Sequence, residues 1–445
     1  MALIRPFRAL HYNPSRVADL GRVVTQPYDK ITPEMQSRYY DASPYNLVRV
    51  IRGRVGAQDH AEENVYRRAA GYFREWMDEG ILIPDGESAI YPYDQEYEVP
   101  GGSGSKRVRS AFIALCRLED YAAKIVHAHE ETLSAPKADR LELLKITRAH
   151  FGQIFVLYSD PAGVVESLWA SARRGNPWEQ VSDEYGTLHS VWRLAEPRAI
   201  ERVAAAMADK KLVIADGHHR YETALAYRNY CRAQGMAEAR AEYVMMTFVR
   251  MESEGLTILP THRLVRGLPE FHWAEFLGQA RSIFEVEEFP AAAAEAGWCA
   301  GFLEALVAAG RQGPAFGAYG GPGKSALLRL RSDFQLADVL NDLAPTQRRL
   351  DVVLLHRLVL EQILGVDRQA VREEKNLTYH REFSAAAAEV REGKAQLALA
   401  LNPTPVEAVR DNALAGLTLP QKSTDFYPKL LSGLAIYWLG EKSSG

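Results

Sequence analysis

The sequence predicts a mixed α/β fold that is divided into two regions. The chain has 445 residues, which is too long for one typical domain. Short apolar runs alternate with helical segments between residues 150 and 230, which favours strands and helices packed in layers. Helices and strands continue to alternate from residue 269 onward. We therefore expect a first α/β region over residues 1–265 and a C-terminal α/β region over residues 266–445.

The composition is typical of a soluble globular protein. Hydrophobic residues make up 47% of the chain and charged residues 25%. The formal net charge of -4 argues against a dedicated nucleic-acid-binding protein. The three cysteines are widely separated, so neither a disulfide framework nor a CxxC metal site is indicated. The N-terminus lacks the apolar core of a secretory signal, and Glu295 and Glu304 interrupt the Ala-rich stretch 290–310, so we expect a cytoplasmic protein with no membrane partner.

Local signals place the elements of the first region. Thr32 followed by Pro33 is typical of a helix start, and Gly80 of a helix end. Residues 47–51 alternate like a strand, and two β-rich runs joined by the Gly/Ser-rich stretch 100–105 predict a hairpin. The expected helices cover residues 33–40, 62–79, 136–150, 163–172, 197–209 and 220–230. The expected strands cover residues 47–51, 89–99, 106–118, 153–158, 188–194, 212–214 and 243–251.

The same signals continue in the second region. The apolar stretch 351–364, closed by Gly365, predicts a buried helix. The segments 259–263 and 419–429 lack helical periodicity, so we expect loops there. The expected helices cover residues 274–280, 294–309, 351–364, 382–392 and 405–414, and the expected strands cover residues 282–289, 314–319, 325–330, 396–401 and 432–437.

One stretch, Ala215-Asp-Gly-His-His-Arg220, joins an apolar run to a helical segment through a tight turn. The amides in the first turn of a helix have no partner within the helix, and the helix dipole favours negative charge there. This corner is therefore suited to an anion such as phosphate. Arg220 adds a bidentate donor, and Asp216 can hold a magnesium ion or accept a proton.

A plain structural role for the same residues stays open. Asp before Gly is a common turn pair, Asp216 can cap the helix, and one of two adjacent histidines often satisfies a backbone carbonyl. A transition metal on His218 and His219 meets a geometric difficulty, because consecutive helical residues point about 100° apart. The stretch alone thus leaves phosphate binding and a capped turn as alternatives.

Four further polar clusters stand at the ends of expected elements. Each of them suits either a binding cleft or a solvated loop. No HExxH spacing is present, which excludes the zinc metalloprotease motif. The clusters are Tyr28 with Asp29, the run from His129 and Glu130 to Arg140, His262 with Arg263, and the run from Lys422, Ser423 and Thr424 to Lys429.

Taken in order, these clusters resemble family 1015 of domains of unknown function, over nearly the whole chain. The motifs that carry the resemblance are Pro27-Tyr-Asp29, His129-Glu-x-Thr132, Lys137-x-Asp-Arg140, Ala215-Asp-Gly-His-His-Arg220, Pro260-Thr-His-Arg263 and Gln421-Lys-Ser-Thr-x-Phe-Tyr-Pro-Lys429. Within them, residues 216–220 are similar to the phosphate-contacting motif of the ParB and sulfiredoxin superfamily. That similarity implies a ParB/sulfiredoxin-like catalytic region over residues 1–265. By this motif the chain also resembles the free serine kinases, although no cysteine matches that of the sulfiredoxins.

The resemblance implies roles for individual residues. Asp216 would hold magnesium or orient the substrate hydroxyl, and Asp29, Glu34 and Glu130 are alternatives for the general base. A carboxylate base is sufficient because phosphoryl transfer needs mainly alignment and charge neutralisation. The implied phosphate and nucleotide contacts are Gly217, His218, His219, Arg220, His129, Arg140, His262, Arg263, Lys422, Ser423, Thr424 and Lys429.

These roles together predict a magnesium-dependent small-molecule kinase. It would transfer a phosphoryl group from ATP, ADP or pyrophosphate to free L-serine or a similar hydroxyl compound. Neither a Walker A motif nor the protein-kinase motifs are present. A phosphoserine hydrolase could use the same cationic cleft, and a ParB-like switch would bind nucleotide without turnover. Both remain alternatives, and the sequence also allows a homodimer.

Overall fold

The computed structural model describes residues 1–102, 104–131, 135–236, 238–289 and 297–440. The chain forms two compact units. Unit 1 takes Met1–Ala128, Thr132–Thr257 and Phe426–Gly445, and unit 2 takes His129–Glu131 and Ile258–Asp425. The sequence suggested one boundary near residue 265, whereas the chain returns to unit 1 at Phe426. The spacing of apolar residues predicts each helix or strand, but it does not predict to which unit that helix or strand belongs.

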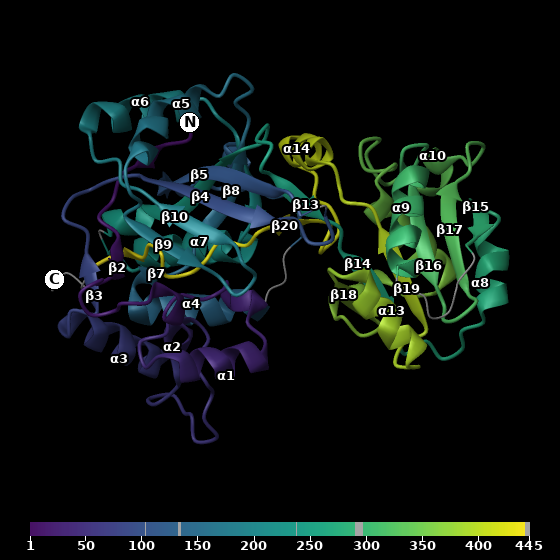
Figure 1. The fold of residues 1–445 in the computed structure, drawn as a ribbon, viewed down its shortest axis with the longest axis horizontal. Coiled ribbons are helices and arrows are strands. Elements are labelled where there is room, and N and C mark those ends of the chain that lie inside the picture. The colour runs from purple at the N-terminus through teal and green to yellow at the C-terminus, as the bar shows by residue number, and fades with distance from the viewer. Residues whose placement is uncertain (103, 132–134, 237, 290–296, 441–445) are drawn as a thin grey trace. The chain divides into compact units, whose positions relative to one another are not determined.

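Unit 1 is built on a nine-stranded mixed sheet (Figure 1). The strand order is β6-β11-β8-β12-β5-β4-β10-β9, and β1 pairs with β5. The pairs β6–β11 and β8–β12 are parallel and the others are antiparallel. The strands are β1 (Ile4–Arg5), β4 (Tyr91–Glu98), β5 (Lys106–Arg117), β6 (Val126–His127), β8 (Ile154–Tyr158), β9 (Glu179–Ser182), β10 (Leu188–Val191), β11 (Leu212–Asp216) and β12 (Tyr243–Arg250). The predicted α/β fold class and the predicted hairpin of β4 and β5 are confirmed.

Helices cover both faces of this sheet. In Figure 1, α5 (Val164–Trp169) and α6 (Pro197–Met207) lie above the sheet, and α1 (Pro33–Ala42), α3 (Val65–Asp78) and α4 (Ala135–Thr147) lie below it. One buried core joins strand residues to α5, α6 and the start of α7 (His218–Ala233). A second core joins α1 and α3 to the two-stranded sheet of β2 (Leu10–Tyr12) and β3 (Leu82–Pro84). The corner at the end of β11 therefore stands on a well-packed scaffold.

The predicted strand at residues 47–51 is wrong, because these residues form the short helix α2 (Val48–Ile51). The Asn46 side chain accepts a hydrogen bond from the Val48 amide at 2.9 Å and so supports a helical turn. Val48, Val50 and Ile51 are all buried. Because this helical turn is buried on several sides, the alternation of Val48 and Val50 does not indicate a strand here.

Unit 2 contains a six-stranded antiparallel sheet in the order β15-β17-β16-β19-β14-β18. Separate buried cores pack on it, one with α8 and the segment 351–363 and the other with α9 and α13. The strands are β14 (His262–Val265), β15 (Phe284–Glu288), β16 (Ala315–Tyr319), β17 (Ser325–Leu330), β18 (Leu377–His380) and β19 (Leu397–Leu401). The helices are α8 (Trp273–Ala280), α9 (Trp298–Gly310), α10 (Leu336–Val339), α11 (Asp351–Leu354), α12 (Arg368–Arg372), α13 (Phe383–Arg391) and α14 (Val406–Leu414). Residues 294–296 of the helix expected at 294–309 lie outside the described residues.

Two further segments depart in part from expectation. The buried helix expected at 351–364 is present, but after α11 it continues as a π-helix over Leu355–Ile363. The strand expected at 432–437 shrinks to β21 (Tyr437–Trp438), which pairs with β7 (Ala149–His150). Before β21, Ser432 and Ile436 each make one isolated bridge, to Thr25 and Leu10.

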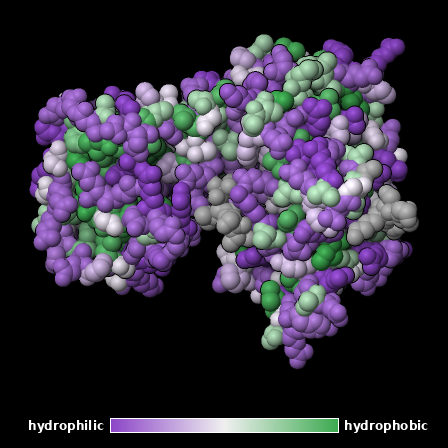
Figure 2. Space-filling model, turned by 180° about the vertical axis from the view of Figure 1, so that it is seen from behind, coloured by the Kyte–Doolittle hydropathy of each residue, from purple (hydrophilic) through white to green (hydrophobic). Residues whose placement is uncertain are grey.

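On the face shown in Figure 2, hydrophilic residues cover most of the surface and hydrophobic residues appear between them in patches. Among the described residues, none of the helices has the length and apolar character needed to cross a bilayer. Two short strands, β13 (Thr257–Leu259) and β20 (Asp425–Tyr427), lie where the chain changes unit.

Candidate functional site

The strand β11 ends at Asp216, and α7 begins two residues later at His218. Gly217 makes this turn with φ 94°, a left-handed conformation that favours glycine. An added Cβ at Gly217 would lie 3.1 Å from the Arg220 guanidinium carbon. Arg220 therefore folds back over the turn, and Gly217 leaves room for its guanidinium. The predicted strand, turn and helix are all present.

The Asp216 carboxylate lies between two cations. Its Oδ1 is 3.5 Å from Arg220 Nη2, and its Oδ2 is 3.5 Å from Lys429 Nζ. The Asp216 side chain is 22% exposed, so solvent still reaches it. Burial by itself would raise the pKa of Asp216, but Lys429, Arg220, Lys30 and His218 outweigh it and hold this pKa far below its usual range. Asp216 is therefore ionised at every physiological pH.

Arg220 is fixed by a second, buried anchor. Its Nη1 donates a hydrogen bond to the Gln153 carbonyl oxygen. The Gln153 side chain in turn accepts a hydrogen bond from the Thr247 hydroxyl of β12, and its Nε2 donates to the Leu431 carbonyl at 3.4 Å. Because Gln153 is buried and bonded on both sides, it holds the Arg220 guanidinium beside the corner.

Lys429 is positioned by a fully buried arginine, Arg109 of β5. Arg109 donates to the carbonyl oxygens of Tyr427 at 3.1 Å and of Pro428 at 2.5 Å. It also donates to Gln95 Oε1, and Gln95 Nε2 donates to the Lys429 carbonyl at 2.9 Å. Burial lowers the pKa of Arg109 to about 10, so it stays charged near neutral pH. These hydrogen bonds hold the backbone of residues 427–429 in place.

The Pro27-Tyr-Asp29 motif lies beside the same corner. Burial and Asp29 raise the pKa of Tyr28, while Arg220 and Arg140 act to lower it. The Arg140 guanidinium of α4 lies 4.3 Å from the centre of the Tyr28 ring. Tyr28, Arg140 and Arg220 also line a small cavity of about 70 Å³. Asp29 is exposed, and no side-chain bond to another described residue fixes it.

The two adjacent histidines occupy different environments. His218 is buried, whereas His219 is half-buried at the next helical position. Within the described parts of the chain, no group of three or more histidine, cysteine or acidic side chains could hold a metal ion.

His129, Glu130 and Thr424 belong to unit 2 and bond to one another. His129 Nε2 lies 2.8 Å from the Thr424 hydroxyl oxygen. Glu130 Oε1 accepts hydrogen bonds from both the amide and the hydroxyl of Thr424, each at 3.1 Å. The Glu130 side chain is 17% exposed. His129, Glu130 and Thr424 therefore form a tight cluster, which ties the segment 129–131 to the rest of unit 2. Thr132, the last residue of this motif, lies outside the described residues.

His262 and Arg263 were expected in a loop, but they are the first two residues of β14 and both are buried. Burial, Arg263 and His380 lower the pKa of His262 to about 3, so its ring is neutral, and its Nδ1 accepts a hydrogen bond from the Leu401 amide at 3.2 Å. Arg263 donates to the carbonyl oxygens of Gln421 at 3.3 Å and Lys422 at 3.0 Å. The Pro260-Thr-His-Arg263 motif thus fastens the segment that carries Lys422.

Ser423 and Lys422 also differ in their surroundings. Ser423 is buried, and its hydroxyl donates to the Pro420 carbonyl at 2.5 Å. Its own carbonyl accepts a hydrogen bond from the Thr404 hydroxyl at 2.7 Å. Lys422 is exposed, with φ 56°. Ser423 therefore serves the local fold, and Lys422 is directed to solvent.

The structure divides the predicted site residues between the two units. Unit 1 brings together Asp29, Arg140, Asp216, Gly217, His218, His219, Arg220 and Lys429, and unit 2 holds His129, Glu130, His262, Arg263, Lys422, Ser423 and Thr424. Lys429, which is expected in the C-terminal region, belongs to unit 1. Glu34 lies at the first turn of α1 and is exposed.

Several residues that shape the corner were not predicted. They are Lys30, Gln95, Arg109 and Gln153. Arg109 lies in the polar first half of β5, near Arg107 and Ser110, so no local pattern marked it as buried. Gln95 also lies 3.4 Å from His189 Nδ1, whose ring faces Asp183 at 3.3 Å. These contacts join strands that are distant in sequence, so no local pattern reveals them.

Comparisons with known proteins place the chain in a family. The model of the family described as "Protein of unknown function (DUF1015)" matches residues 4–353. No curated protein matches the chain. The chain is similar to a solved conserved hypothetical protein from Pyrococcus furiosus, with 12% identity, a TM-score of 0.36, and coverage of 74% of this chain and 95% of that one.

Two other solved structures are similar at the same level. One is a free serine kinase in complex with AMP, with 14% identity, a TM-score of 0.35, and coverage of 72% of this chain and 92% of that one. Another is SbnI with a C-terminal truncation from Staphylococcus aureus, with 10% identity, a TM-score of 0.32, and coverage of 72% and 85%. Similarities at such TM-scores carry no conclusion about activity, whereas the family model spans most of the sequence. The chain therefore belongs to the family described as "Protein of unknown function (DUF1015)".

Proposed function

We propose that unit 1 transfers a phosphoryl group from a nucleotide or pyrophosphate to a small hydroxyl compound. The observation that carries this proposal is the ionised Asp216 carboxylate, which lies between Lys429 and Arg220 at the start of α7. Free L-serine as the acceptor, giving O-phosphoserine, comes from the sequence resemblance to the free serine kinases.

The corner combines three sources of positive potential. The first-turn amides of α7 have no acceptor within the helix, and Gly217 provides no side-chain cap to occupy them. The helix dipole adds partial positive charge at the same end. Arg220 and Lys429 contribute full charges, and Lys30 and His218 also act on Asp216. Phosphate oxygens are the anions that such a helix start and an arginine fork suit.

The low pKa of Asp216 restricts its role. A general base works best when its pKa lies near the operating pH, so a strongly acidic carboxylate is a poor proton acceptor. An ionised carboxylate is instead a suitable oxygen ligand for magnesium, which usually takes one or two protein carboxylates and fills its other positions with water and substrate phosphates. Asp216 fits such a site when a nucleotide supplies the phosphates. The magnesium ion would neutralise charge on the transferred group.

Asp29 is the carboxylate that we assign to proton removal. It is exposed beside Tyr28, whose pKa also responds to Asp216 and Arg220, so it belongs to the same corner. Glu130 is less suited, because Thr424 donates two hydrogen bonds to its Oε1. The substrate hydroxyl oxygen would form the new P–O bond as the bond to the leaving phosphate breaks, and its proton would pass to Asp29.

The test incubates the full chain with magnesium, L-serine and ATP, ADP or pyrophosphate in turn, and follows O-phosphoserine by ³¹P NMR. Asp216→Asn and Lys429→Met should each lower turnover at least a hundredfold. Asp209→Asn and Lys106→Met change exposed residues of unit 1 and serve as matched controls that should keep full turnover. Circular dichroism checks that every variant is folded.

Other outcomes separate the alternatives. Release of phosphate from O-phosphoserine without the forward reaction would indicate a hydrolase instead. Loss of one bound nucleotide per chain in Lys429→Met, without either reaction, would indicate a nucleotide-binding switch at the corner. Turnover that survives Asp216→Asn would show that Asp216 only shapes the turn and would refute its assigned role.

A further inference from the structure

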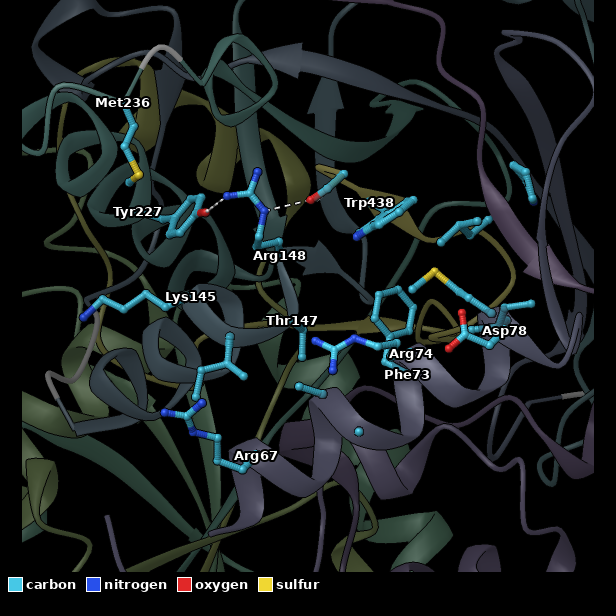
Figure 3. A pocket seen from close by; sticks show the side chains of 18 of the residues that line it. Arg67, Phe73, Arg74, Asp78, Lys145, Thr147, Arg148, Tyr227, Met236 and Trp438 are labelled. Atoms are coloured by element: carbon cyan, nitrogen blue, oxygen red, sulfur yellow. Dashed lines mark hydrogen bonds between the residues drawn. The ribbon is translucent and has the colours of Figure 1, made fainter. Parts of the chain in front are cut away.

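A wide cleft lies in unit 1 at the opposite end of α7 from Asp216, and Figure 3 shows it from close by. Its volume is about 890 Å³, within the range of about 300–1,000 Å³ that is typical of small-molecule sites. We call it the α3–α7 cleft. Its lining comes from α3, the end of α4, the C-terminal half of α7 and the segment around β21. None of the residues in the Asp216 corner lines it.

Two arginines of α3 supply positive charge to this cleft. Arg67 and Arg74 are two helical turns apart, so they lie on the same face of α3 and roughly 10 Å apart along its axis. Both are exposed, and neither side chain bonds to another residue in the described ranges. Lys145 at the end of α4 adds a third cation. Asp78 is the acidic residue among those that line the cleft, so the lining carries a net positive charge.

Aromatic side chains form another part of the lining. Tyr227 and Tyr230 of α7 have ring centres 6.4 Å apart, and Tyr230 is 40% exposed. The Lys145 ammonium lies 5.0 Å from the centre of the Tyr230 ring. Trp438 and the apolar Met77 complete this surface. The cleft therefore offers flat, apolar faces next to its cations.

Arg148 keeps this lining in place. Its Nε donates to the Gly440 carbonyl at 2.7 Å, and its Nη1 lies 3.5 Å from the Tyr227 hydroxyl oxygen (Figure 3). Its Nη2 pairs with Glu238. The charge of Arg148 is thus used within the protein, whereas Arg67 and Arg74 remain open to a ligand.

We propose that the α3–α7 cleft binds a small aromatic anion of the nucleoside phosphate class. A planar base can pack on Tyr230 or Trp438, because stacking on an aromatic ring accepts any base. The phosphate can reach Arg67 and Arg74, whose guanidinium forks match phosphate oxygens. Inorganic phosphate would leave the aromatic faces uncovered, and an apolar ligand would leave the two arginines without a counter-charge. A nucleoside phosphate satisfies both parts of the lining.

This site is separate from the proposed catalytic corner. Tyr230 follows His218 by twelve residues of α7, which corresponds to roughly 18 Å along the helix axis. Binding in the cleft does not depend on phosphoryl transfer at Asp216, so either proposal can fail alone.

The test titrates AMP and ADP into the full chain by isothermal calorimetry. Lys429→Met disables the corner, and in this background we expect one nucleotide to bind per chain. Adding Arg67→Gln with Arg74→Gln should weaken that binding at least tenfold, and adding Tyr230→Ala should weaken it less. Arg198→Gln with Arg202→Gln changes two exposed arginines of α6 and is the matched control, which should leave the affinity unchanged.

The outcomes distinguish the two proposals. Failure of the Lys429→Met protein to bind either nucleotide, or equal binding after the Arg67 and Arg74 changes, would refute the cleft site. Equal weakening by the α6 pair would show a general charge effect and would refute it too. The Arg67→Gln, Arg74→Gln protein with Lys429 intact should keep its turnover of L-serine. Cleft binding without any turnover would refute only the proposed catalytic function.

Discussion

Replacing Arg109 by Met should destabilise unit 1 and displace Lys429. Arg109 is completely buried and serves three acceptors, which are Gln95 Oε1 and the carbonyl oxygens of Tyr427 and Pro428. Met keeps most of the apolar volume of the side chain but donates no hydrogen bond. Each buried acceptor that loses its donor costs about 1–3 kcal/mol. Three such losses predict a decrease of about 3 kcal/mol or more in the free energy of unfolding.

Calorimetry can measure this effect directly. For a unit of this size, 1 kcal/mol corresponds to a shift of about 2–4 °C in melting temperature, so Arg109→Met should lower the Tm of unit 1 by about 6 °C or more. The matched control is Arg198→Met, which changes an exposed arginine of α6 and should stay within about 0.5 kcal/mol of the parent. A decrease below about 1 kcal/mol for Arg109→Met would show that the three acceptors find other donors, and the reasoning would fail.

Three further predictions concern other parts of the chain. Gly217→Ala should lower the free energy of unfolding by about 1–2 kcal/mol in denaturant titrations, because φ is 94° there and the new Cβ would meet Arg220. The control is Gly71→Ala in α3, where a Cβ has open space, and this change should be neutral or stabilising. Burial raises the pKa of Glu179 to about 7 in the folded protein. Between about pH 4.5 and pH 7 the folded state therefore keeps a proton that the unfolded state releases. The contribution of Glu179 to the free energy of unfolding falls as the pH rises through this window. Glu179→Gln should remove that fall, and parallel curves of Tm against pH for parent and variant would contradict it. Thr424→Val removes the hydroxyl that bonds to His129 and Glu130, so it should lower the free energy of unfolding of unit 2 by about 1–2 kcal/mol in urea titrations. Thr418→Val changes an exposed threonine and should leave this free energy unchanged. Equal effects of the two changes would argue against the cluster.

Local patterns in the sequence were sufficient for elements with a strong period or a clear stop signal. The hairpin of β4 and β5, the amphipathic helix α3 and the turn at Gly217 all follow from apolar spacing and from the properties of glycine. The pattern failed at residues 47–51, where enclosure of one short turn made both faces apolar. It also failed at His262 and Arg263, because polar residues at a strand start resemble a loop when their buried partners are unknown.

The residues of the corner could be predicted from the sequence, since Asp216, Gly217 and Arg220 lie within five positions of one another and a helix start attracts anions wherever it lies. The distant residues that join them could not be predicted, because folding brings them there. Lys429 comes to Asp216 because Arg109 and Gln95, on two other strands, clamp the backbone around it. The tertiary structure also assigned His129 and Glu130 to a cluster with Thr424, and it placed Arg67 and Arg74 beside Tyr230 in one cleft. Such arrangements depend on strand order and helix packing, which bring together residues up to hundreds of positions apart. They cannot be predicted from the local period of 2 residues in a strand or 3.6 residues in a helix.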